Sequence, residues 1–151
     1  MVTVEALTAK DWRNVLDVDV TEEQRARLDF RSMLEFLAEA RFHLDFAPCA
    51  IRADGEMVGF VSYGAPADDL ARWWMPLLII DRRHQRRGYG RAALDAIVAD
   101  VRERAPDATA LGLSYHASNE AAASLYRSAG FVETEANERG ERVAWLPLRQ
   151  G

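Results

Sequence analysis

The sequence has a single cysteine, Cys49, among 151 residues. One cysteine cannot form an intramolecular disulfide and cannot build a cysteine-rich zinc site. The three histidines are scattered and show no metal-ligand spacing, so we expect no bound metal. The longest apolar run, residues 73–80, is interrupted by Pro76 and is too short to span a bilayer, and residues 1–10 contain no secretory hydrophobic segment. We therefore expect a cytoplasmic protein with no membrane partner.

The chain also lacks an excess of positive charge. Its formal net charge is −5, which argues against non-specific binding of nucleic acid. Apolar residues make up 49% and charged residues 28% of the chain, which is typical of a globular protein, and the length predicts one domain over residues 1–151. Five arginines nevertheless fall within ten residues that contain no acid: Arg82, Arg83, Arg86, Arg87 and Arg91. Such a local positive segment indicates a polyanion smaller than a duplex.

The spacing of apolar residues predicts one α/β domain with a partly antiparallel sheet. The Asp54-Gly55 pair between two alternating segments predicts a β-hairpin. Thr21 and Gln24 have the spacing of a capping box, and apolar residues at i, i+3, i+4 and i+7 from Phe30 extend that helix to about Ala40. The expected strands are residues 2–7, 50–53, 57–63, 73–80, 110–115, 131–135 and 142–148, and further helices are expected at 11–16, 88–105 and 118–129.

An Arg- and Gly-rich turn separates the buried strand ending at Ile80 from the next amphipathic helix. Helix N-termini bind phosphate through unpaired N–H groups, Gly88 and Gly90 allow close approach, and arginines add charge-assisted contacts. No Gly-Lys-Ser/Thr sequence is present, which excludes a Walker phosphate loop. A dinucleotide-binding pattern fits as far as Ala93, but the acid expected about twenty residues later is not convincingly placed. On the turn alone, an ordinary helix start with solvated arginines remains the other interpretation.

Two motifs in this half of the chain resemble the GNAT-type N-acetyltransferase superfamily. Residues 85–90, Gln-Arg-Arg-Gly-Tyr-Gly, are similar to its Gln/Arg-x-x-Gly-x-Gly/Ala motif, and residues 119–131 are similar to its Asn…Ala-x-x-Leu-Tyr-x-x-x-Gly-Phe segment. The resemblance covers residues 50–148 and implies a GNAT-like fold, a mixed, mostly antiparallel sheet of about six to seven strands with about four helices and a splayed central strand pair. It also implies acetyl-CoA as co-substrate. The cofactor-binding residues that it implies are Leu78, Ile79, Ile80, Gln85, Arg86, Arg87, Gly88, Tyr89, Gly90, Arg91, Asn119 and Tyr126.

The same resemblance implies that the acetyl group passes directly from the thioester to an amine, so Cys49 is expected to be a small buried hydrophobe rather than a nucleophile. Tyr126, with a reference pKa near ~10, is expected to protonate the departing thiolate. A backbone N–H of residues 78–80 is expected to stabilise the oxyanion, beside an irregularity that Pro76 marks. Asn119 and Tyr126 share nearly one helix face about 10 Å apart, a span that suits a pantetheine arm. Taken singly, these two residues are a helix-start residue and a core aromatic.

A closer resemblance, on residues 18–24 and 58–64 and on Trp74, is to the bacterial spermine/spermidine (diamine) acetyltransferases. It implies a polyamine or a related small amine as acceptor, and an acidic, partly aromatic cleft suits such a cation. The implied substrate-binding residues are Glu22, Glu23 and Trp74, while Glu23 and Asp81 join Tyr126 as candidate catalytic residues. The two glutamates also suit the first turn of a helix, and Asp81 also suits a pair with a neighbouring arginine.

This chain departs from those enzymes near the expected acceptor side. Leu77 stands where they commonly have arginine, and residues 25–30 lack their Phe-Val-x-Pro-Asn character. Transfer to another amine, such as an amino acid, an aminoglycoside or a protein N-terminus, therefore stays open, as does a non-catalytic acyl-CoA sensor. The resemblance allows a homodimer, and it identifies neither the acceptor nor the general base.

Overall fold

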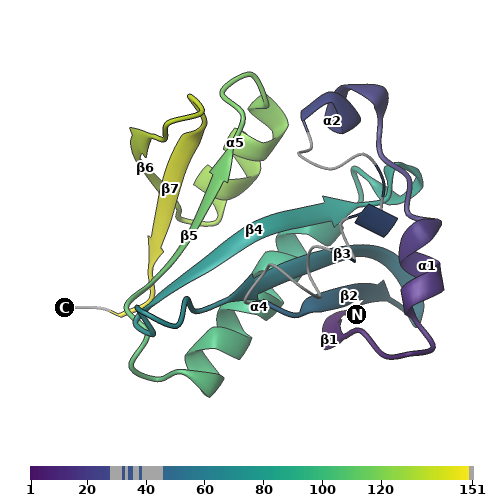
Figure 1. Cartoon of the computed structure of the whole chain (residues 1–151), viewed down its shortest axis with the longest axis horizontal. Coiled ribbons are helices and arrows are strands. Elements are labelled where there is room, and N and C mark those ends of the chain that lie inside the picture. Colours follow the sequence, from purple (N-terminus) through teal and green to yellow (C-terminus); the bar gives the residue numbers. More distant parts are fainter. Residues whose placement is uncertain (28–31, 33, 36–37, 39–45, 150–151) are drawn as a thin grey trace.

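The computed structural model describes residues 1–27, 32, 34, 35, 38 and 46–149. Its centre is a seven-stranded sheet with the order β1-β2-β3-β4-β5-β7-β6 (Figure 1). Neighbouring strands are antiparallel except β4 and β5, which are parallel. The strands are β1 (Val2–Ala6), β2 (Pro48–Ala53), β3 (Glu56–Gly64), β4 (Arg72–Ile80), β5 (Ala110–Tyr115), β6 (Val132–Ala136) and β7 (Arg142–Pro147). The expected mixed, mostly antiparallel sheet is confirmed.

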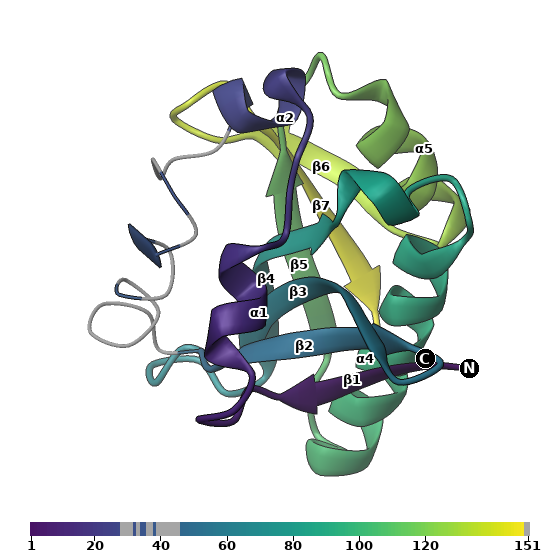
Figure 2. The ribbon, with the colours of Figure 1, turned by 90° about the vertical axis from the view of Figure 1, so that its right-hand side faces the viewer.

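Helices cover both faces of this sheet. The α-helices of the described residues include α1 (Trp12–Leu16), α2 (Glu22–Arg27), α4 (Tyr89–Arg104) and α5 (Glu120–Ser128), and a 3-10 turn, η1 (Arg82–His84), follows β4. Figure 2 shows α1 on one face of the sheet and α4 and α5 on the other. None of the helices within the described ranges is both long enough and apolar enough to cross a membrane.

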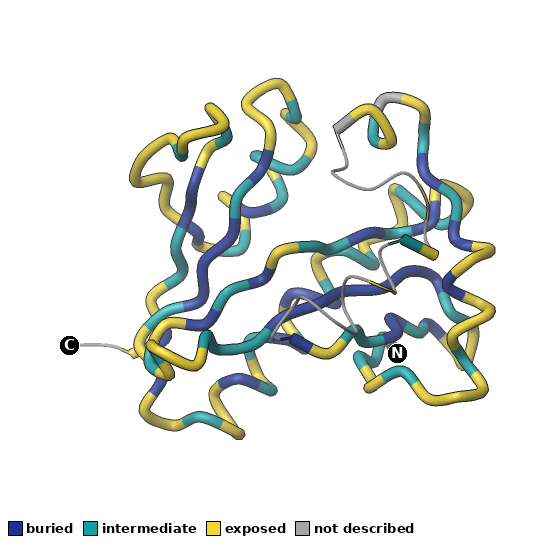
Figure 3. Tube along the Cα trace, in the orientation of Figure 1, coloured by how far each residue is buried: buried dark blue, intermediate teal, exposed yellow. Residues whose placement is uncertain are grey.

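Two buried clusters hold these layers together. The larger one joins α4, through Leu94, Ile97 and Val101, to inward-facing residues of β3, β4 and β5. The smaller one joins Val15 of α1 to Phe60 and Ile79 on the opposite face. The central strand β3 is buried along most of its length, whereas the edge strand β6 is exposed throughout (Figure 3).

The parallel pair β4–β5 separates part of the way along. Its register is limited to Arg72↔Ala110, Trp73↔Leu111 and Trp74↔Gly112, whereas β4 stays paired with β3 as far as Ile80. Figure 1 shows the two strands diverging from this point. The β3–β4 register shifts between Ser62 and Gly64, so β4 carries an extra residue beside Pro76, which cannot donate a ladder hydrogen bond. The expected splayed central pair is therefore confirmed.

The expected helix from Thr21 to Ala40 is only partly found. The capping box is confirmed, because Thr21 N–H donates to Gln24 Oε1 (3.0 Å) and Gln24 N–H donates to Thr21 Oγ1 (3.2 Å). The prediction of one continuous helix is wrong, because Ser32 lies in a bend. The Oγ of Ser32 accepts a hydrogen bond from Glu35 N–H (3.2 Å), as a helix N-cap does. Of the apolar positions that suggested continuity, three lie outside the described residues: Phe30, Met33 and Leu37.

Candidate active site

The turn before α4 contains main-chain N–H groups that precede the hydrogen-bond ladder of the helix. Gly88 (φ +79°) and Arg86 (φ +64°) both adopt the left-handed backbone conformation. This conformation favours glycine, which explains the glycine at position 88. The first intrahelical bond runs from Ala92 N–H to Gly88 O (3.0 Å). The N–H groups from Gly88 to Arg91 therefore precede the helical ladder and, within the described part of the chain, have no acceptor. This arrangement is suited to an anion.

Three elements, β4, α4 and the more distant α5, meet at Gly90. A Cβ placed on Gly90 would lie 3.3 Å from Leu125 Cδ2 of α5 and 3.9 Å from Ile80 Cγ1 of β4. The guanidinium of Arg91 donates to Ser128 O (2.9 Å), which fastens α4 to the end of α5. The start of α4, the separated end of β4 and helix α5 thus form one neighbourhood.

The five arginines divide into two groups. Arg82 pairs with Asp19 (2.6 Å), Arg83 binds Asp81, and Arg91 contacts Asp95 (3.2 Å) and Ser128. Arg86 and Arg87 are exposed and form no ion pair with any residue of the described ranges. Of the arginines expected to bind cofactor, these two remain available for phosphate oxygens, while Arg91 also fastens two helices.

The side chain of Gln85 is directed back toward the protein. Its Nε2 donates to Ile80 O (3.0 Å) and to Gln24 Oε1 (3.1 Å). The NH₂ group of Gln85 is therefore engaged within the protein, which leaves its main chain and its Oε1 for a cofactor. Tyr89, the next expected residue, is half-buried with its ring 6.4 Å from that of His84.

Of the three strand residues expected to bind cofactor, Leu78, Ile79 and Ile80, only two direct their N–H groups to the free edge of β4. Asp81 N–H donates to Val58 O (2.7 Å), so it points toward β3. Backbone groups alternate between the two edges of a strand, so the N–H of Ile79 also points toward β3. The N–H groups of Leu78 and Ile80 point toward the side from which β5 has separated. Leu78 and Ile80 are therefore the pair free to contact an acyl thioester.

Tyr126 lies buried on α5. Its ring packs between Tyr115 and Phe131, at centroid distances of 5.6 and 5.7 Å. Burial, together with the neighbouring phenol of Tyr115, raises the pKa of Tyr126 to about 12, so its hydroxyl keeps its proton at physiological pH. At the start of the same helix, Asn119 caps α5, because its Oδ1 accepts from Ala122 N–H (3.1 Å). Only the amide NH₂ of Asn119 is left for a ligand.

The carboxylate of Asp81 holds neighbouring segments together through hydrogen bonds, a role called the Asp81 anchor below, and is not positioned as a base. Its buried carboxylate accepts from the main-chain N–H and guanidinium of Arg83 (2.7–2.9 Å) and from Asp19 N–H (3.1 Å). Burial alone would raise the pKa of Asp81, but these hydrogen bonds outweigh it and lower the pKa to about 2. So weak a base, with its oxygens already occupied, is unsuited to take a proton from an amine.

The candidate acceptor residues lie on two different elements, β4 and α2. Trp74 sits at the last position of β4 that pairs with β5, half-buried, with its ring 5.5 Å from that of Trp145. Glu22 is exposed at the start of α2, and Glu23 follows it, although its side chain lies outside the described part. Leu77 packs with the small cluster beside α1.

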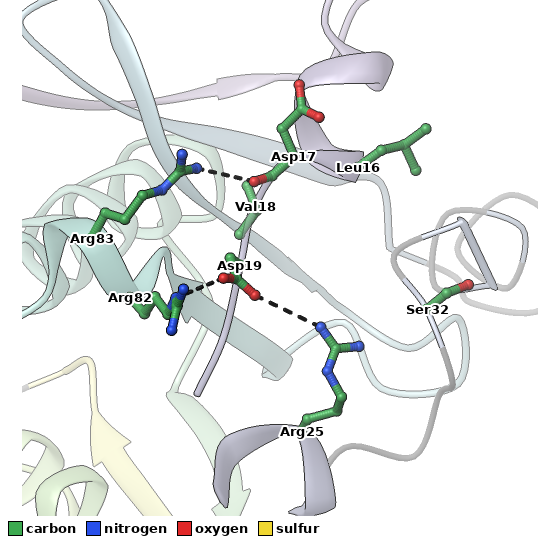
Figure 4. A pocket seen from close by; sticks show the side chains of 8 residues that line it. All are labelled: Leu16, Asp17, Val18, Asp19, Arg25, Ser32, Arg82 and Arg83. Atoms are coloured by element: carbon green, nitrogen blue, oxygen red, sulfur yellow. Dashed lines mark hydrogen bonds and ion pairs between the residues drawn. The ribbon is translucent and has the colours of Figure 1, made fainter. Parts of the chain in front are cut away.

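A pocket of about 430 Å³ lies between residues 16–19, Arg25 and the two arginines that follow Asp81 (Figure 4). Asp19 stands between Arg82 (2.6 Å) and Arg25 (3.9 Å) in its wall. None of the expected cofactor residues lines this pocket, whose lining residues are Leu16, Asp17, Val18, Asp19, Arg25, Ser32, Arg82 and Arg83.

Two residues of this neighbourhood could not be predicted from the sequence. Gln24 was identified only as a helix cap, and its contact with Gln85 joins positions 61 residues apart, which no local pattern reveals. Trp145 was placed in a strand without a role, although it packs on Trp74 and over Gly112, where a Cβ would lie 2.5 Å from its ring.

Comparison with known proteins agrees with this fold and geometry. The acetyltransferase (GNAT) family matches residues 7–131. The chain is 28% identical to the spermine/spermidine N(1)-acetyltransferase of Bacillus subtilis (strain 168), over 94% of this chain and 95% of that protein. The ribosomal-protein-S18-alanine N-acetyltransferase of Escherichia coli superposes with a TM-score of 0.73 at 24% identity, covering 100% of this chain and 96% of that one. The PaiA N-acetyltransferase of Thermoplasma acidophilum, solved with coenzyme A, superposes with a TM-score of 0.70 at 16% identity, covering 97% and 99%.

The seven-stranded sheet with its separated central pair defines an acetyltransferase-type α/β fold. The chain belongs to the acetyltransferase (GNAT) family, whose match spans most of its length. It is an N-acetyltransferase that uses acetyl-CoA as co-substrate.

The anchor role of Asp81 predicts an acid-sensitive loss of stability. Asp81→Asn should lower the free energy of unfolding at pH 7 by about 2 kcal/mol, because charge-assisted hydrogen bonds are lost. The pKa of Asp81 is lowered from 3.8 to about 2, so its stabilising contribution is present above pH 4 and is lost as the pH falls through that interval. Urea unfolding across this pH range should show the difference between wild type and variant shrinking toward pH 2. The exposed Asp107→Asn is the control, and a difference that does not depend on pH would contradict the anchor role.

The division of the arginines predicts unequal effects on cofactor affinity. Replacing Arg86 and Arg87 together by alanine should weaken acetyl-CoA binding by about tenfold, with most of the loss seen at low ionic strength. Arg82→Ala removes the same kind of charge from the same segment, but this side chain is paired with Asp19, so it should leave affinity unchanged. Isothermal titration calorimetry at low and high salt measures both effects. Full-strength binding after the double change would mean that these arginines only face solvent.

Proposed function

We propose that this enzyme acetylates a primary amine of a polyamine such as spermidine or spermine, or of a related small amine. The observation that carries the proposal is the meeting of the α4 N-terminus, the free edge of β4 and helix α5 at Gly90. In the proposal, the start of α4 holds a diphosphate, the edge of β4 supplies donors to a thioester carbonyl, and Tyr126 of α5 supplies a buried phenol.

The polyamine assignment is supported by similarity and by charge. The relative from Bacillus subtilis, a spermine/spermidine N(1)-acetyltransferase, aligns along nearly the whole chain. The protein is acidic, with a net charge of −5, and Glu22 and Glu23 open α2 beside the Gln85 contact to β4. An acidic surface near the reaction site attracts a flexible polycation and repels anionic competitors.

In the proposed complex, the N–H groups of Gly88 to Arg91 hold the diphosphate of acetyl-CoA together with Arg86 and Arg87. The amide NH₂ of Asn119 and the exposed N–H groups of Leu78 and Ile80 hold the pantetheine arm and the acetyl group. At the thioester carbonyl, these strand donors stabilise the negative charge that develops on oxygen as the amine attacks.

The chemistry then requires two proton movements. The amine nitrogen forms a bond to the acetyl carbon, and the carbon–sulfur bond breaks. Tyr126 gives its proton to the departing thiolate, and the proton released by the amine, moving through water, restores the phenol. The burial that raises the pKa of Tyr126 to about 12 keeps this donor protonated across the working pH range.

An amine panel tests the acceptor. Release of free thiol from acetyl-CoA should be measured with spermidine, spermine, putrescine, an amino acid, an aminoglycoside and an alanine-terminated peptide. We expect kcat/KM for spermidine or spermine to exceed that for the peptide by about tenfold or more, since fixed anionic groups favour the polycation. A preference for the peptide, the amino acid or the aminoglycoside would overturn the polyamine assignment.

The donor role of Tyr126 predicts a selective loss of turnover. Tyr126→Phe keeps the ring packing but removes the proton, so kcat should fall by at least about tenfold while the Kd of acetyl-CoA stays within about twofold. Because the pKa of Tyr126 is about 12, wild-type kcat should show no loss from this group up to about pH 10. Tyr115→Phe is the matched control, since that phenol is bonded to Glu133 rather than free. Equal kcat in Tyr126→Phe and wild type would exclude the donor role.

A further inference from the structure

We propose that Gln85 is a positioning residue that fixes helix α2, on the amine side, relative to the free edge of β4, on the acetyl side. The proposal rests on the function above only in assigning α2 to the amine side. Its structural basis is the pair of hydrogen bonds from Gln85 Nε2 to Ile80 O (3.0 Å) and to Gln24 Oε1 (3.1 Å).

The orientation of both amides is determined by their neighbours. Thr21 N–H donates to Gln24 Oε1, so that atom is the carbonyl oxygen. Gln85 must then present its NH₂ to this oxygen and to the carbonyl of Ile80, because two acceptors cannot bond each other. The swapped orientation of Gln85 would place its oxygen against two other oxygens, so a single arrangement is compatible with all three hydrogen bonds.

One of these bonds replaces a missing strand partner. The carbonyl of Ile80 lies on the edge of β4 from which β5 has separated. A sheet would normally satisfy such a carbonyl from the next strand. Here Gln85 supplies the donor from its own turn, which lets the edge stay open without leaving this group unpaired.

The other hydrogen bond joins Gln85 to Gln24, which belongs to the capping box at the start of α2. This helix has six residues, too few to be stable alone, and its first turn depends on Gln24. By holding Gln24, Gln85 sets where the first turn of α2, with Glu22 and Glu23, stands relative to β4. The Asp81 anchor holds a different part of the chain, through Asp19 N–H.

Four single variants separate this role from a general effect on α2. Gln85→Glu has the same shape but no donor, and Gln24→Met removes the acceptor. Thr21→Val breaks the cap bond from Gln24 N–H (3.2 Å) yet leaves the contact between the two glutamines. Gln24→Glu keeps an acceptor at both bonds and serves as the conservative variant.

With the best amine of the panel as probe, Gln85→Glu and Gln24→Met should each raise KM for the amine about fivefold, because both remove the hydrogen bond between Gln85 and Gln24. KM for acetyl-CoA should stay within about twofold in Gln24→Met. Thr21→Val and Gln24→Glu should keep the wild-type KM for the amine. The double variant of Gln85 and Gln24 should be no worse in this KM than Gln85→Glu alone, because both changes break the same hydrogen bond between Gln85 and Gln24. Additive losses, or an equal loss in Thr21→Val, would overturn the proposal.

A second measurement does not depend on the acceptor. Hydrogen exchange of Thr21 N–H, which is bonded to Gln24 Oε1, should be about fivefold faster in Gln85→Glu than in wild type. Unchanged exchange would overturn the coupling even if no amine of the panel were turned over. Faster exchange together with a peptide preference would support the coupling and reject the polyamine assignment alone.

Discussion

Beyond Trp74, strand β4 keeps β3 on one edge and, among the strands of the described residues, has no partner on the other. A strand edge without a partner is normally costly, because its N–H and C=O groups need bonds. Here the open edge is the feature around which the site is arranged. Its N–H groups at Leu78 and Ile80 face the gap, the carbonyl of Ile80 is satisfied by Gln85, and helix α4 begins beside it.

The cost of keeping this edge open is offset by bonds in the segment that follows it. The buried carboxylate of Asp81 collects donors from Arg83 and from Asp19. This arrangement fastens residues 17–19 beneath the turn and directs the turn toward the start of α4. The same segment explains why two of the five arginines form ion pairs within the protein, whereas two others form none with the described residues. Arg82 and Arg83, in η1, turn back toward the acids, whereas Arg86 and Arg87 lie beyond the turn.

Local sequence was enough to predict most of the fold. The Asp54-Gly55 hairpin, the capping box at Thr21 and the helix opening at Gly88 each depend on residues within a few positions of one another. The helix continuing to Ala40 was wrong because periodicity carries no information about the bend at Ser32. The splayed pair was expected from a family resemblance, and Pro76 gave only a hint of where it begins.

The candidate site was less predictable, because its details depend on long-range contacts. Which N–H groups of residues 78–80 are free follows from the register with β3, which the sequence alone does not display. The carboxylate of Asp81 was considered as a base, and only its four hydrogen bonds show why its pKa is about 2. The contact of Gln85 with Gln24 is invisible to any local pattern.

The most direct test of the open edge is residue-resolved amide exchange by NMR, with and without acetyl-CoA. If the thioester arm pairs with β4, the amides of Leu78 and Ile80 and those of Gly88 to Arg91 should gain protection on binding, while the amide of Ile79, already turned toward β3, should change little. Binding of acetyl-CoA that leaves Leu78 and Ile80 exchanging as fast as in the free protein would contradict the account.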